Sequence, residues 1–356
     1  MTINLYVTST QNFSGKSAVC VALMHRMLKD GYRVGYLKPF SSAARVLAES
    51  SIDEDARFIK ETFKLGEPVE ILAPVVVTNQ RMRKILADGG VDYREEVKQA
   101  AAVVSRGKDI VLMEGSDNFR EGYIVNLSLN EVVELMDAKV ITIVGYHNSL
   151  QVVDDILTAL DRLRERLVGI IINAVPEHRL EYVHELVIPY VQKKGANLLA
   201  VLPYQPTLHS ISIGEIVQAL EGELRCGECE EDLVENLTIA AMSVEQTFKY
   251  FREIKNKAVI VGGDRPDIQL AALETSTKAL ILTGHSQPNP MIEAKATEQG
   301  VAIIISPHDT LTTVEKVEHF FGKSRFHQAE KVNRFELLLN NTLDFNELYQ
   351  QIGLQR

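Results

Sequence analysis

The first 31 residues show two different periods in their hydrophobic positions. Apolar side chains occupy every second position of residues 3–7, which predicts a half-buried strand. Apolar side chains then recur at three- and four-residue spacing over residues 20–28, and Gly31 follows where a helix of this pattern would take its C-cap. The segment between them, residues 8–17, is rich in small and polar residues. The chain is therefore predicted to open with a strand, a loop and an amphipathic helix.

Short apolar runs continue to alternate with helical patterns up to residue 203. Clear amphipathic patterns over residues 51–63 and 92–106 predict two of the helices. Regular alternation of strand and helix predicts the α/β class, with a doubly wound, mostly parallel sheet. The runs that predict further strands are residues 33–37, 109–114, 140–144, 168–172 and 198–201.

A second, smaller α/β domain is predicted in the remaining part of the chain. The stretch around Pro203 and Pro206 has no periodicity, which is typical of a linker. Three apolar runs separated by helix-like segments follow, at residues 258–261, 279–282 and 301–305. Two helical patterns close the chain. The predicted divisions are residues 1–203, a linker 204–212, a second domain 213–324 and a helical C-terminal extension 325–356.

Composition narrows the possible environments and partners. The chain has 356 residues, of which 46% are hydrophobic and 24% charged, as in folded globular proteins. Its formal net charge of −10 disfavours non-specific binding to nucleic acid or to an anionic membrane. The apolar runs are too short to span a bilayer, and Met1 leads almost directly into the first strand, so neither a membrane span nor a signal peptide is expected. We expect a cytoplasmic protein.

The chain has three cysteines, Cys20, Cys226 and Cys229. This small number predicts a reducing compartment and no disulfide framework. Cys226 and Cys229 have the spacing of a redox motif, but acidic residues surround them and disfavour a thiolate. No second pair of ligands accompanies them, so a zinc site is not predicted.

The loop between the first strand and helix has the chemistry of a phosphate-binding site. Backbone N–H groups at a helix start point at an anion, and the helix dipole adds to the attraction. Gly15 would let the backbone approach the phosphates, Lys16 would neutralise the β- and γ-phosphates, and Ser17 would ligate Mg²⁺. The usual opening glycine is absent, and Ser9 or Thr10 stands where a positive φ would strain a side chain. The loop is thus either a nucleotide site or a vestigial, purely structural turn.

Polar residues at later strand ends fit the same chemistry. Lys38 follows the second predicted strand, at the sheet edge where α/β proteins bind ligands, and is either a phosphate or substrate contact or a surface lysine. Glu114 ends a buried strand, where it would hold Mg²⁺ or be a simple strand-end turn residue. The acidic residues 53–55 lie at the start of a predicted helix. Taken alone, they indicate negative side chains that interact favourably with the helix dipole.

These motifs together resemble dethiobiotin synthetase from the N-terminus to residue 203. The matching segments are residues 7–17, Lys38-Pro39, Glu114-Gly115 and Asn173. In that family the matching positions bind ATP and Mg²⁺, so the resemblance implies ATP or ADP and Mg²⁺ as cofactors here. The implied nucleotide contacts are Thr10, Gln11, Asn12, Phe13, Ser14, Gly15, Lys16, Ser17 and Asn173, the last reading adenine. The implied Mg²⁺ ligands are Ser17, Asp55 and Glu114.

The resemblance also implies Lys16 and Lys38 as the catalytic groups of any phosphoryl transfer. Two departures from the family limit this reading. Ser9 replaces a glycine before the phosphate loop, and residues 116–119 replace a glycine-rich substrate loop. We therefore expect the nucleotide half of the site to be kept and the biotin-precursor half to be lost.

Polar loops follow all three strands predicted in the second domain. Parallel strands bring such loops to one edge, where they form a second ligand or dimer site or are ordinary turns. The candidate ligand residues are Gly263, Asp264, Arg265, Thr283 and His285.

Residues 263–265 and 269–275 resemble the DRTGG domain. Fused to a dethiobiotin-synthetase-like domain, it resembles the N-terminal region of long bacterial phosphotransacetylases, which the resemblance implies to be regulatory and oligomerising. The acetyl-transfer domain would follow there, whereas this chain ends at Arg356. Acetyltransferase activity is therefore not expected.

Three functional hypotheses follow, and they leave open whether the chain is an enzyme. The first is a regulatory protein that binds Mg-ATP or Mg-ADP, whose second domain senses a small metabolite or builds a homo-oligomer (a dimer or higher). The second is an ATP-dependent synthase that phosphorylates a carboxylate or carbamate, similar to dethiobiotin synthetase or cobyrinic acid a,c-diamide synthase. The third is a structural scaffold with an inactive P-loop. The lost substrate loop favours the first.

Overall fold

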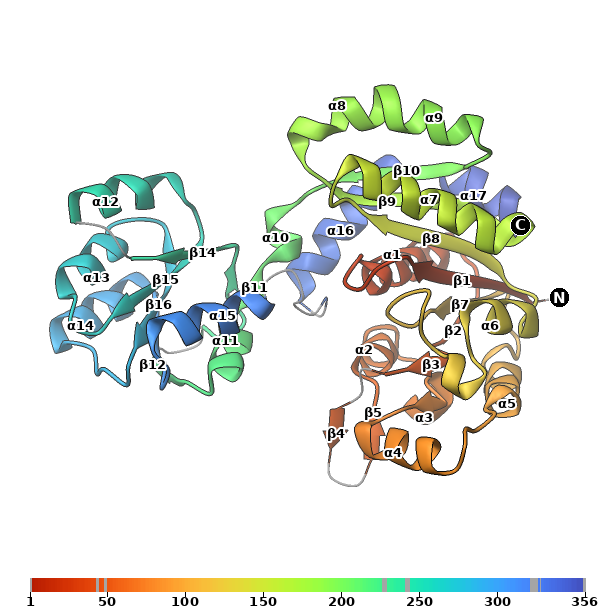
Figure 1. Ribbon diagram of the computed structural model, residues 1–356, viewed down its shortest axis with the longest axis horizontal. Helices are drawn as coiled ribbons and strands as arrows, with labels where there is room; N and C mark the ends of the chain where they lie inside the picture. The colour runs from red at the N-terminus through yellow and green to blue at the C-terminus, as the bar shows by residue number, and fades with distance from the viewer. Residues whose placement is uncertain are drawn as a thin grey trace. The chain divides into compact units, whose positions relative to one another are not determined.

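The computed structural model describes residues 2–42, 45–47, 50–225, 229–240, 244–320, 326 and 328–354. The chain folds as two compact units, each with its own sheet (Figure 1). Unit 1 consists of Met1–Tyr204 together with Val332–Arg356, and unit 2 consists of Gln205–Lys331. Among the helices of the described ranges, none is both long and apolar enough to cross a lipid bilayer.

A six-stranded sheet forms the centre of unit 1. Its strands, in their order across the sheet, are β10 (Leu198–Pro203), β9 (Leu167–Val175), β8 (Lys139–Gly145), β1 (Ile3–Ser9), β7 (Ile110–Glu114) and β2 (Val34–Leu37). Every pair of neighbouring strands runs parallel. All five residues of β7 are buried although side chains alternate between the two faces, so both faces are covered. The predicted α/β class with a doubly wound, mostly parallel sheet is therefore confirmed.

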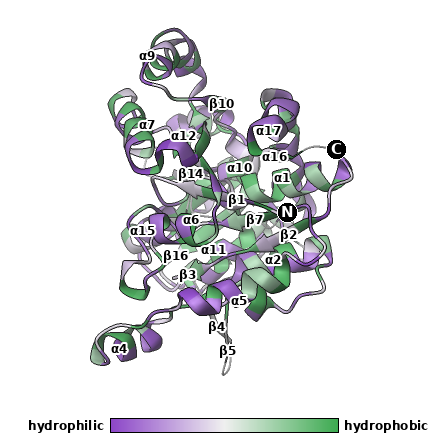
Figure 2. Ribbon diagram, turned by 90° about the vertical axis from the view of Figure 1, so that its right-hand side faces the viewer, coloured by the Kyte–Doolittle hydropathy of each residue, from purple (hydrophilic) through white to green (hydrophobic). Residues whose placement is uncertain are grey.

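Amphipathic helices connect these strands. They are α1 (Lys16–Lys29), α2 (Glu54–Phe63), α3 (Val69–Leu72), α4 (Asn79–Ala87), α5 (Arg94–Val104), α6 (Leu129–Leu135), α7 (Ser149–Leu163), α8 (Leu180–Tyr182) and α9 (Ile188–Lys193). Figure 2 shows hydrophobic and hydrophilic stretches alternating along the longer of these helices, such as α4, α5 and α7, as expected for helices that pack one side on a sheet. Short elements complete the unit: strands β3 (Phe40–Ser41), β4 (Arg45–Leu47), β5 (Ser50–Ile52) and β6 (Val75–Val76), and irregular helical turns η1 (Tyr123–Val125), η2 (Arg164–Arg166), η3 (Glu177–Arg179) and η4 (Val183–Val187).

The last two helices, α16 (Ala329–Thr342) and α17 (Phe345–Ile352), return the end of the chain to unit 1. The Tyr349 hydroxyl donates a hydrogen bond of 2.8 Å to Asp30, at the C-cap of α1. The Arg26 guanidinium lies 4.6 Å from the centre of the Phe345 ring. Polar and cation–π contacts therefore hold α17 against the first helix of the chain.

A five-stranded sheet forms the centre of unit 2. Its strands, in order, are β12 (Glu223–Arg225), β17 (Ala302–Ile305), β16 (Thr277–Thr283), β15 (Lys257–Gly262) and β14 (Asn236–Ile239). β14 to β17 are parallel, and β12 is antiparallel to β17 at one edge. The other elements are β11 (Ile211–Ser212), β13 (Leu233–Val234), α10 (Pro206–His209), α11 (Ile213–Leu220), α12 (Val244–Glu253), α13 (Pro266–Leu273), α14 (Pro290–Gln299) and α15 (Thr310–Phe320). Residues 204–212, for which a linker was predicted, thus include α10 and β11.

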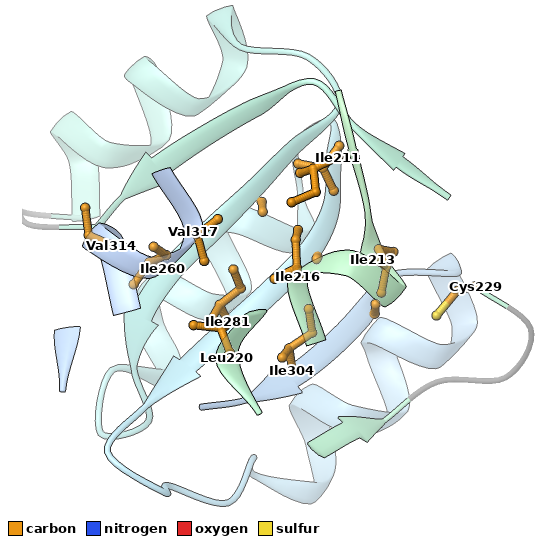
Figure 3. Close-up of a cluster of buried hydrophobic side chains, with 14 residues drawn as sticks. Ile211, Ile213, Ile216, Leu220, Cys229, Ile260, Ile281, Ile304, Val314 and Val317 are labelled. Carbon is orange, nitrogen blue, oxygen red and sulfur yellow. The ribbon is translucent and has the colours of Figure 1, made fainter. Parts of the chain in front are cut away.

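Alternate residues of the central strands enter two separate cores of unit 2. Ile260 of β15 packs with apolar side chains of α11 and α15, whereas Val259 and Val261 pack with α12, α13 and α14. Figure 3 shows the first of these clusters, in which Ile216 of α11 and Val317 of α15 face the strands. The sheet therefore lies between two helical layers, and its loops are left at the strand ends.

Candidate functional site

The carboxyl ends of three neighbouring strands bring together the predicted site residues of unit 1. β1 ends at Ser9 and leads into the loop before α1, β7 ends at Glu114, and β2 ends immediately before Lys38. Because β7 pairs with both β1 and β2, these three ends lie side by side. Lys16, Lys38 and Glu114 are all buried there. Buried charges of this kind need compensating charges or hydrogen bonds.

The loop between β1 and α1 turns at Phe13 and Gly15. Phe13 has a φ of 54°, and Gly15, the N-cap of α1, has a φ of 95°. A Cβ atom at Gly15 would lie 2.6 Å from Nδ2 of Asn173, so glycine is required there for space as well as for conformation. Ser9 belongs to β1, and neither Ser9 nor Thr10 has a positive φ. The strain considered for a side chain at these two positions therefore does not arise.

Two hydroxyl groups of this loop have no hydrogen-bond partner among the described residues. The side-chain oxygens of Thr10 and Ser14 are buried and unpaired, and Ser14 as a whole is only 5% exposed. The N-cap residue Gly15 provides no side-chain hydrogen bond to the first turn of α1. An unpaired buried hydroxyl and uncapped helix N–H groups both cost free energy. Together they form a donor set suited to a phosphate group.

Lys16 directs its ammonium group into the site, where the protein holds it. Its Nζ donates to Oγ of Ser9 at 3.0 Å and to the backbone carbonyl of Asp117 at 2.7 Å. Burial lowers the pKa of Lys16, and the neighbouring Asp117 and Glu114 oppose this shift. Both of its partners are uncharged oxygens, so an anion would bind this ammonium more strongly than the protein does.

Glu114 lies between two hydroxyl donors. Its Oε1 accepts from Ser17 at 2.7 Å, and its Oε2 accepts from Tyr36 at 2.8 Å. Burial raises the pKa of Glu114, and the charge of Lys38 opposes that effect. Burial and the charge of Glu114 raise the pKa of Tyr36 well above its ordinary value, so the phenol keeps the proton that it donates. Tyr36 and Ser17 therefore fix the orientation of this carboxylate.

Lys38 lies between two carboxylates. Its Nζ is 2.9 Å from Oδ2 of Asp53 and 2.7 Å from Oδ2 of Asp55. Burial alone would lower the pKa of Lys38, but the charges of Asp55 and Asp53 outweigh it and raise the pKa well above its ordinary value. Asp53 is 1% exposed and also accepts from Ser41 and from the backbone N–H of Ala56, which makes it the N-cap of α2. The acids at the start of α2 thus cap the helix and also bind Lys38.

The oxygen atoms predicted to hold Mg²⁺ belong to these two networks. Ser17 and Glu114 are in contact, whereas Asp55 binds Lys38. Hydroxyl and carboxylate oxygens are ligands that Mg²⁺ accepts, usually completed by water and phosphate oxygens. Within the described ranges, no group of three or more His, Cys, Asp or Glu is arranged to hold a metal. The residues therefore fit a Mg²⁺ ion that arrives with a nucleotide, which Ser17, Glu114 and Asp55 would hold.

Gln11 and Asn12 connect the loop to neighbouring segments. Nε2 of Gln11 donates to Asp155 of α7 at 2.6 Å and to the carbonyl of Gly145 at 3.3 Å. Oδ1 of Asn12 accepts from Nδ2 of Asn118 at 2.6 Å. Their side chains thus brace the loop, and a direct contact with nucleotide remains a prediction for both.

Asn173 lies behind the loop, near the end of β9. Its Nδ2 donates to the backbone carbonyl of Ser14, and its Oδ1 accepts from the backbone N–H of Ala174, both at 2.9 Å. Both polar atoms of the side chain thus have protein partners. The predicted contact between Asn173 and adenine remains a prediction.

Sequence reasoning missed three groups of this site. Asp53 was read only as a complement to the helix dipole, although an acid directly before a helix and close to Lys38 could have suggested the ion pair. Tyr36 is one of the residues of β2, and its phenol gave no signal of a polar role. The carbonyl of Asp117 is a backbone group, which the residue type does not identify.

The polar loops of unit 2 meet at the carboxyl edge of its sheet. A Cβ atom at Gly263 would lie 1.9 Å from the Cβ of Ser286, so the loops after β15 and β16 are in contact. The hydroxyl of Thr283 lies 3.0 Å from that of Thr310, which follows β17. His285 has a φ of 55°. The structure therefore gathers the predicted loops at one edge, and ligand binding there remains a prediction.

Asp264 and Arg265 complete the candidate residues of this edge. Asp264 is exposed, and Nε of Arg265 lies 3.6 Å from a carboxylate oxygen of Asp267. Arg265 is also the N-cap residue of α13. Exposed ion pairs at this distance contribute little to stability, so this guanidinium is free to exchange partners.

The cysteine pair is only partly described, because residues 226–228 lie outside the described residues. Cys20 is a buried free thiol. Cys229 is buried. The described residues do not test the prediction of a reducing compartment and no disulfide framework, which stays a prediction.

Comparison with known proteins follows the same two-part division. The family model of an AAA domain matches residues 3–212, more than half of the chain, and the family model of the DRTGG domain matches residues 215–320. A phosphate acetyltransferase of Synechocystis sp. is 26% identical over 311 residues, which cover 82% of this chain and 43% of that protein. A phosphate acetyltransferase of Nitratidesulfovibrio vulgaris is 25% identical over 371 residues, which cover 98% of this chain and 51% of that protein.

An ATP-dependent dethiobiotin synthetase of Salmonella typhimurium is 23% identical over 215 residues, which cover 60% of this chain and 91% of that protein. The chain spans about half the length of the phosphate acetyltransferases that it matches. The resemblance to dethiobiotin synthetase, to the DRTGG domain and to the N-terminal region of long phosphotransacetylases is confirmed.

Proposed function

Because this chain belongs to the AAA domain family through residues 3–212 and carries a DRTGG domain after it, we propose that it is a regulatory protein that binds Mg-ATP or Mg-ADP in unit 1. Unit 2 would sense a small metabolite or build a homo-oligomer. This role would be related to the control of phosphotransacetylase, since phosphate acetyltransferases are among its relatives.

The observation that carries the proposal is the donor set before α1. Among the residues that the structure describes, the hydroxyls of Thr10 and Ser14 are buried without partners, and Lys16 is bound to two uncharged oxygens. Gly15 leaves the first turn of α1 without a side-chain cap. Each of these groups gains a partner when a phosphate enters. Buried hydroxyls without a protein partner are usually satisfied by water or by a ligand, and here two of them lie in one loop beside the start of α1.

Mg²⁺ would be held by Ser17, Glu114 and Asp55 together with phosphate oxygens. The ion, when bound, would neutralise charge on the β- and γ-phosphates. Tyr36 would keep the Glu114 carboxylate oriented through its hydrogen bond of 2.8 Å. Lys38 would leave Asp55 for a phosphate or substrate oxygen while staying tied to Asp53, which is the more buried of the two acids.

Isothermal titration calorimetry with Mg-ATP and with Mg-ADP tests the proposal. We expect dissociation constants in the micromolar to sub-millimolar range for the wild type. Lys16→Ala should weaken binding at least about tenfold, because a charge-assisted contact worth about 1.4 kcal/mol or more is lost. Lys98→Ala is the matched control, since Lys98 is an exposed lysine of α5 in the same unit. A null titration with folded wild-type protein would reject the proposal.

A second candidate function is an ATP-dependent synthase. The observation that favours it is the pairing of Lys38 with Asp55 beside Glu114, since these residues would also serve phosphoryl transfer to a carboxylate or carbamate. Phosphate release from Mg-ATP should be measured with a panel of small carboxylates and amines. Steady release stimulated by one compound would favour the synthase, and binding without stimulated release would favour the regulatory protein.

A further inference from the structure

We propose that residues 116–121, here called the latch, close on the phosphate-binding loop and compete with nucleotide for Lys16. The inference rests on the proposed nucleotide binding and adds a form of regulation to the same site. β7 ends at Glu114, and the latch begins after one intervening residue, Gly115. Its tip, Asp117 and Asn118, reaches the phosphate-binding loop.

The first contact of the latch occupies the phosphate lysine. The carbonyl oxygen of Asp117 accepts from Nζ of Lys16 at 2.7 Å. It also lies 3.1 Å from Oγ of Ser9, whose one proton has a shorter acceptor in the carbonyl of Gln11 at 2.6 Å. Ser9 also accepts from Nζ of Lys16 at 3.0 Å. Ser9 and the latch thereby take two of the three N–H donors of this ammonium, which leaves one for a β- or γ-phosphate.

The second contact joins two side chains across the site. Nδ2 of Asn118 donates to Oδ1 of Asn12 at 2.6 Å. Oδ1 of Asn118 accepts from the backbone N–H of Arg120 at 2.8 Å, which fixes the side chain within the latch. The amide of Asn118 thus connects the latch to the same loop that would wrap the phosphates.

The base of the latch is anchored by a buried aromatic side chain. Phe119 is 4% exposed, and its carbonyl accepts from Nη1 of Arg162 on α7 at 3.1 Å. The Glu121 carboxylate accepts from the backbone N–H of Asp117 at 3.3 Å and from Ser42 at 3.2 Å. The buried ring of Phe119 therefore anchors the base, while the tip is held by its hydrogen bonds to Lys16 at 2.7 Å and to Asn12 at 2.6 Å.

Competition has a direct effect on affinity. If nucleotide binds only the open form, its apparent dissociation constant is the intrinsic value divided by the open fraction. The bond between Asn12 and Asn118 is one of the contacts that favour the closed form. Removing one hydrogen bond of ordinary strength shifts such an equilibrium by about three- to tenfold. Loosening the latch should therefore strengthen nucleotide binding.

The decisive variant is Asn118→Ala in the full chain, with Mg-ATP titrated by calorimetry and association followed by stopped flow with a fluorescent ATP analogue. We expect binding about three- to tenfold tighter than in the wild type, with faster association. Asn346→Ala, at an exposed asparagine of α17 in the same unit, is the control and should leave both unchanged. Unchanged or weaker binding in Asn118→Ala would overturn the latch.

A measurement on the wild type keeps the test independent of the variant. Hydrogen–deuterium exchange with saturating Mg-ATP should show protection of residues 10–17 and faster exchange in residues 116–121. Protection of both segments would mean that residues 116–121 fold over the nucleotide, which contradicts the latch. Binding by Asn118→Ala but not by the wild type would support it. Absence of binding in both proteins would reject the proposed function and the latch together.

Discussion

Replacing Lys38 by methionine should destabilise unit 1 strongly, because it leaves buried negative charge without a partner. The side chains of Lys38 and Asp53 are 7% and 1% exposed, and Asp55 is 33% exposed. Removing one partner of a buried ion pair typically costs about 3–5 kcal/mol. Asp53 keeps its hydrogen bonds from Ser41 and Ala56, and Asp55 can turn to water, so we expect the lower end, about 3 kcal/mol. Methionine preserves most of the apolar stem, so packing contributes little to this loss.

Differential scanning calorimetry is the suitable assay, because the chain has no tryptophan and folds as two units. A loss of about 3 kcal/mol should lower the melting temperature of unit 1 by about 6–12 °C, at 2–4 °C per kcal/mol for a domain of this size. The transition of unit 2 should not move. Lys98→Ala, an exposed lysine, should change neither transition by a measurable amount.

The double variant Lys38→Met, Asp53→Asn distinguishes electrostatics from packing. Asparagine keeps the N-cap of α2, since its Oδ1 can still accept from Ala56, but it removes the buried charge. Most of the lost stability should return. A double variant that is as unstable as the sum of the two single variants would refute the reasoning.

The stability difference between wild type and Lys38→Met depends on pH in a way that follows from the direction in which the pKa of Lys38 is shifted. The pKa of Lys38 is raised above its ordinary value of 10.5 in the folded protein, so its contribution is complete below that value and is lost only as the pH rises above it. The difference in stability between wild type and Lys38→Met should therefore be constant from about pH 6 to pH 9. A difference that shrinks steadily over this range would contradict the assignment of a charged Lys38.

Two further predictions concern other parts of the chain. Gly263→Ala should destabilise unit 2 by about 1–3 kcal/mol in calorimetry, because its Cβ would lie 1.9 Å from the Cβ of Ser286, whereas Gly66→Ala, in open space, should not. Hydrogen bonds from Arg33 hold the pKa of Asp109 at about 2, so an NMR titration of Arg33→Gln should show the pKa of Asp109 returning towards 3.8. The stability that this carboxylate contributes is present above pH 3.8 and is lost as the pH falls towards 2.

The architecture of unit 1 could be predicted because its local signals agree. The alternation in β1, the small residues of the loop and the helical period of α1 all point to one arrangement, and the parallel-sheet rule then places the ends of β1, β2 and β7 together. This is why Lys16, Lys38 and Glu114 could be expected at one site although they are far apart in the sequence. The same rule gathered the loops that carry Gly263 and Thr283 in unit 2.

The partners of those residues could not be predicted, because they depend on geometry that the pattern does not contain. Asp53 and Asp55 are two positions apart at the start of α2, and only the structure shows that both reach Lys38. The phenol of Tyr36 lies on a strand whose residues are all buried, so its pattern indicated only core packing. Similarly, the amphipathic pattern of α17 predicts a helix but not that its Tyr349 binds Asp30, 319 positions away.

The two departures from the dethiobiotin synthetase pattern turn out to be in contact with each other. Ser9 stands where that family has glycine, and Asp117 belongs to the segment that replaces its substrate loop. The hydroxyl of Ser9 lies 2.6 Å from the carbonyl of Gln11 and 3.1 Å from the carbonyl of Asp117, so its one proton is shared between these two acceptors. Ser9 and Asp117 both accept from Nζ of Lys16. Glycine at position 9 would have no group to offer to either partner. We therefore expect Ser9→Gly to loosen the latch as Asn118→Ala does, and to bind Mg-ATP more tightly than the wild type in calorimetry. Weaker binding would show that Ser9 serves the nucleotide itself.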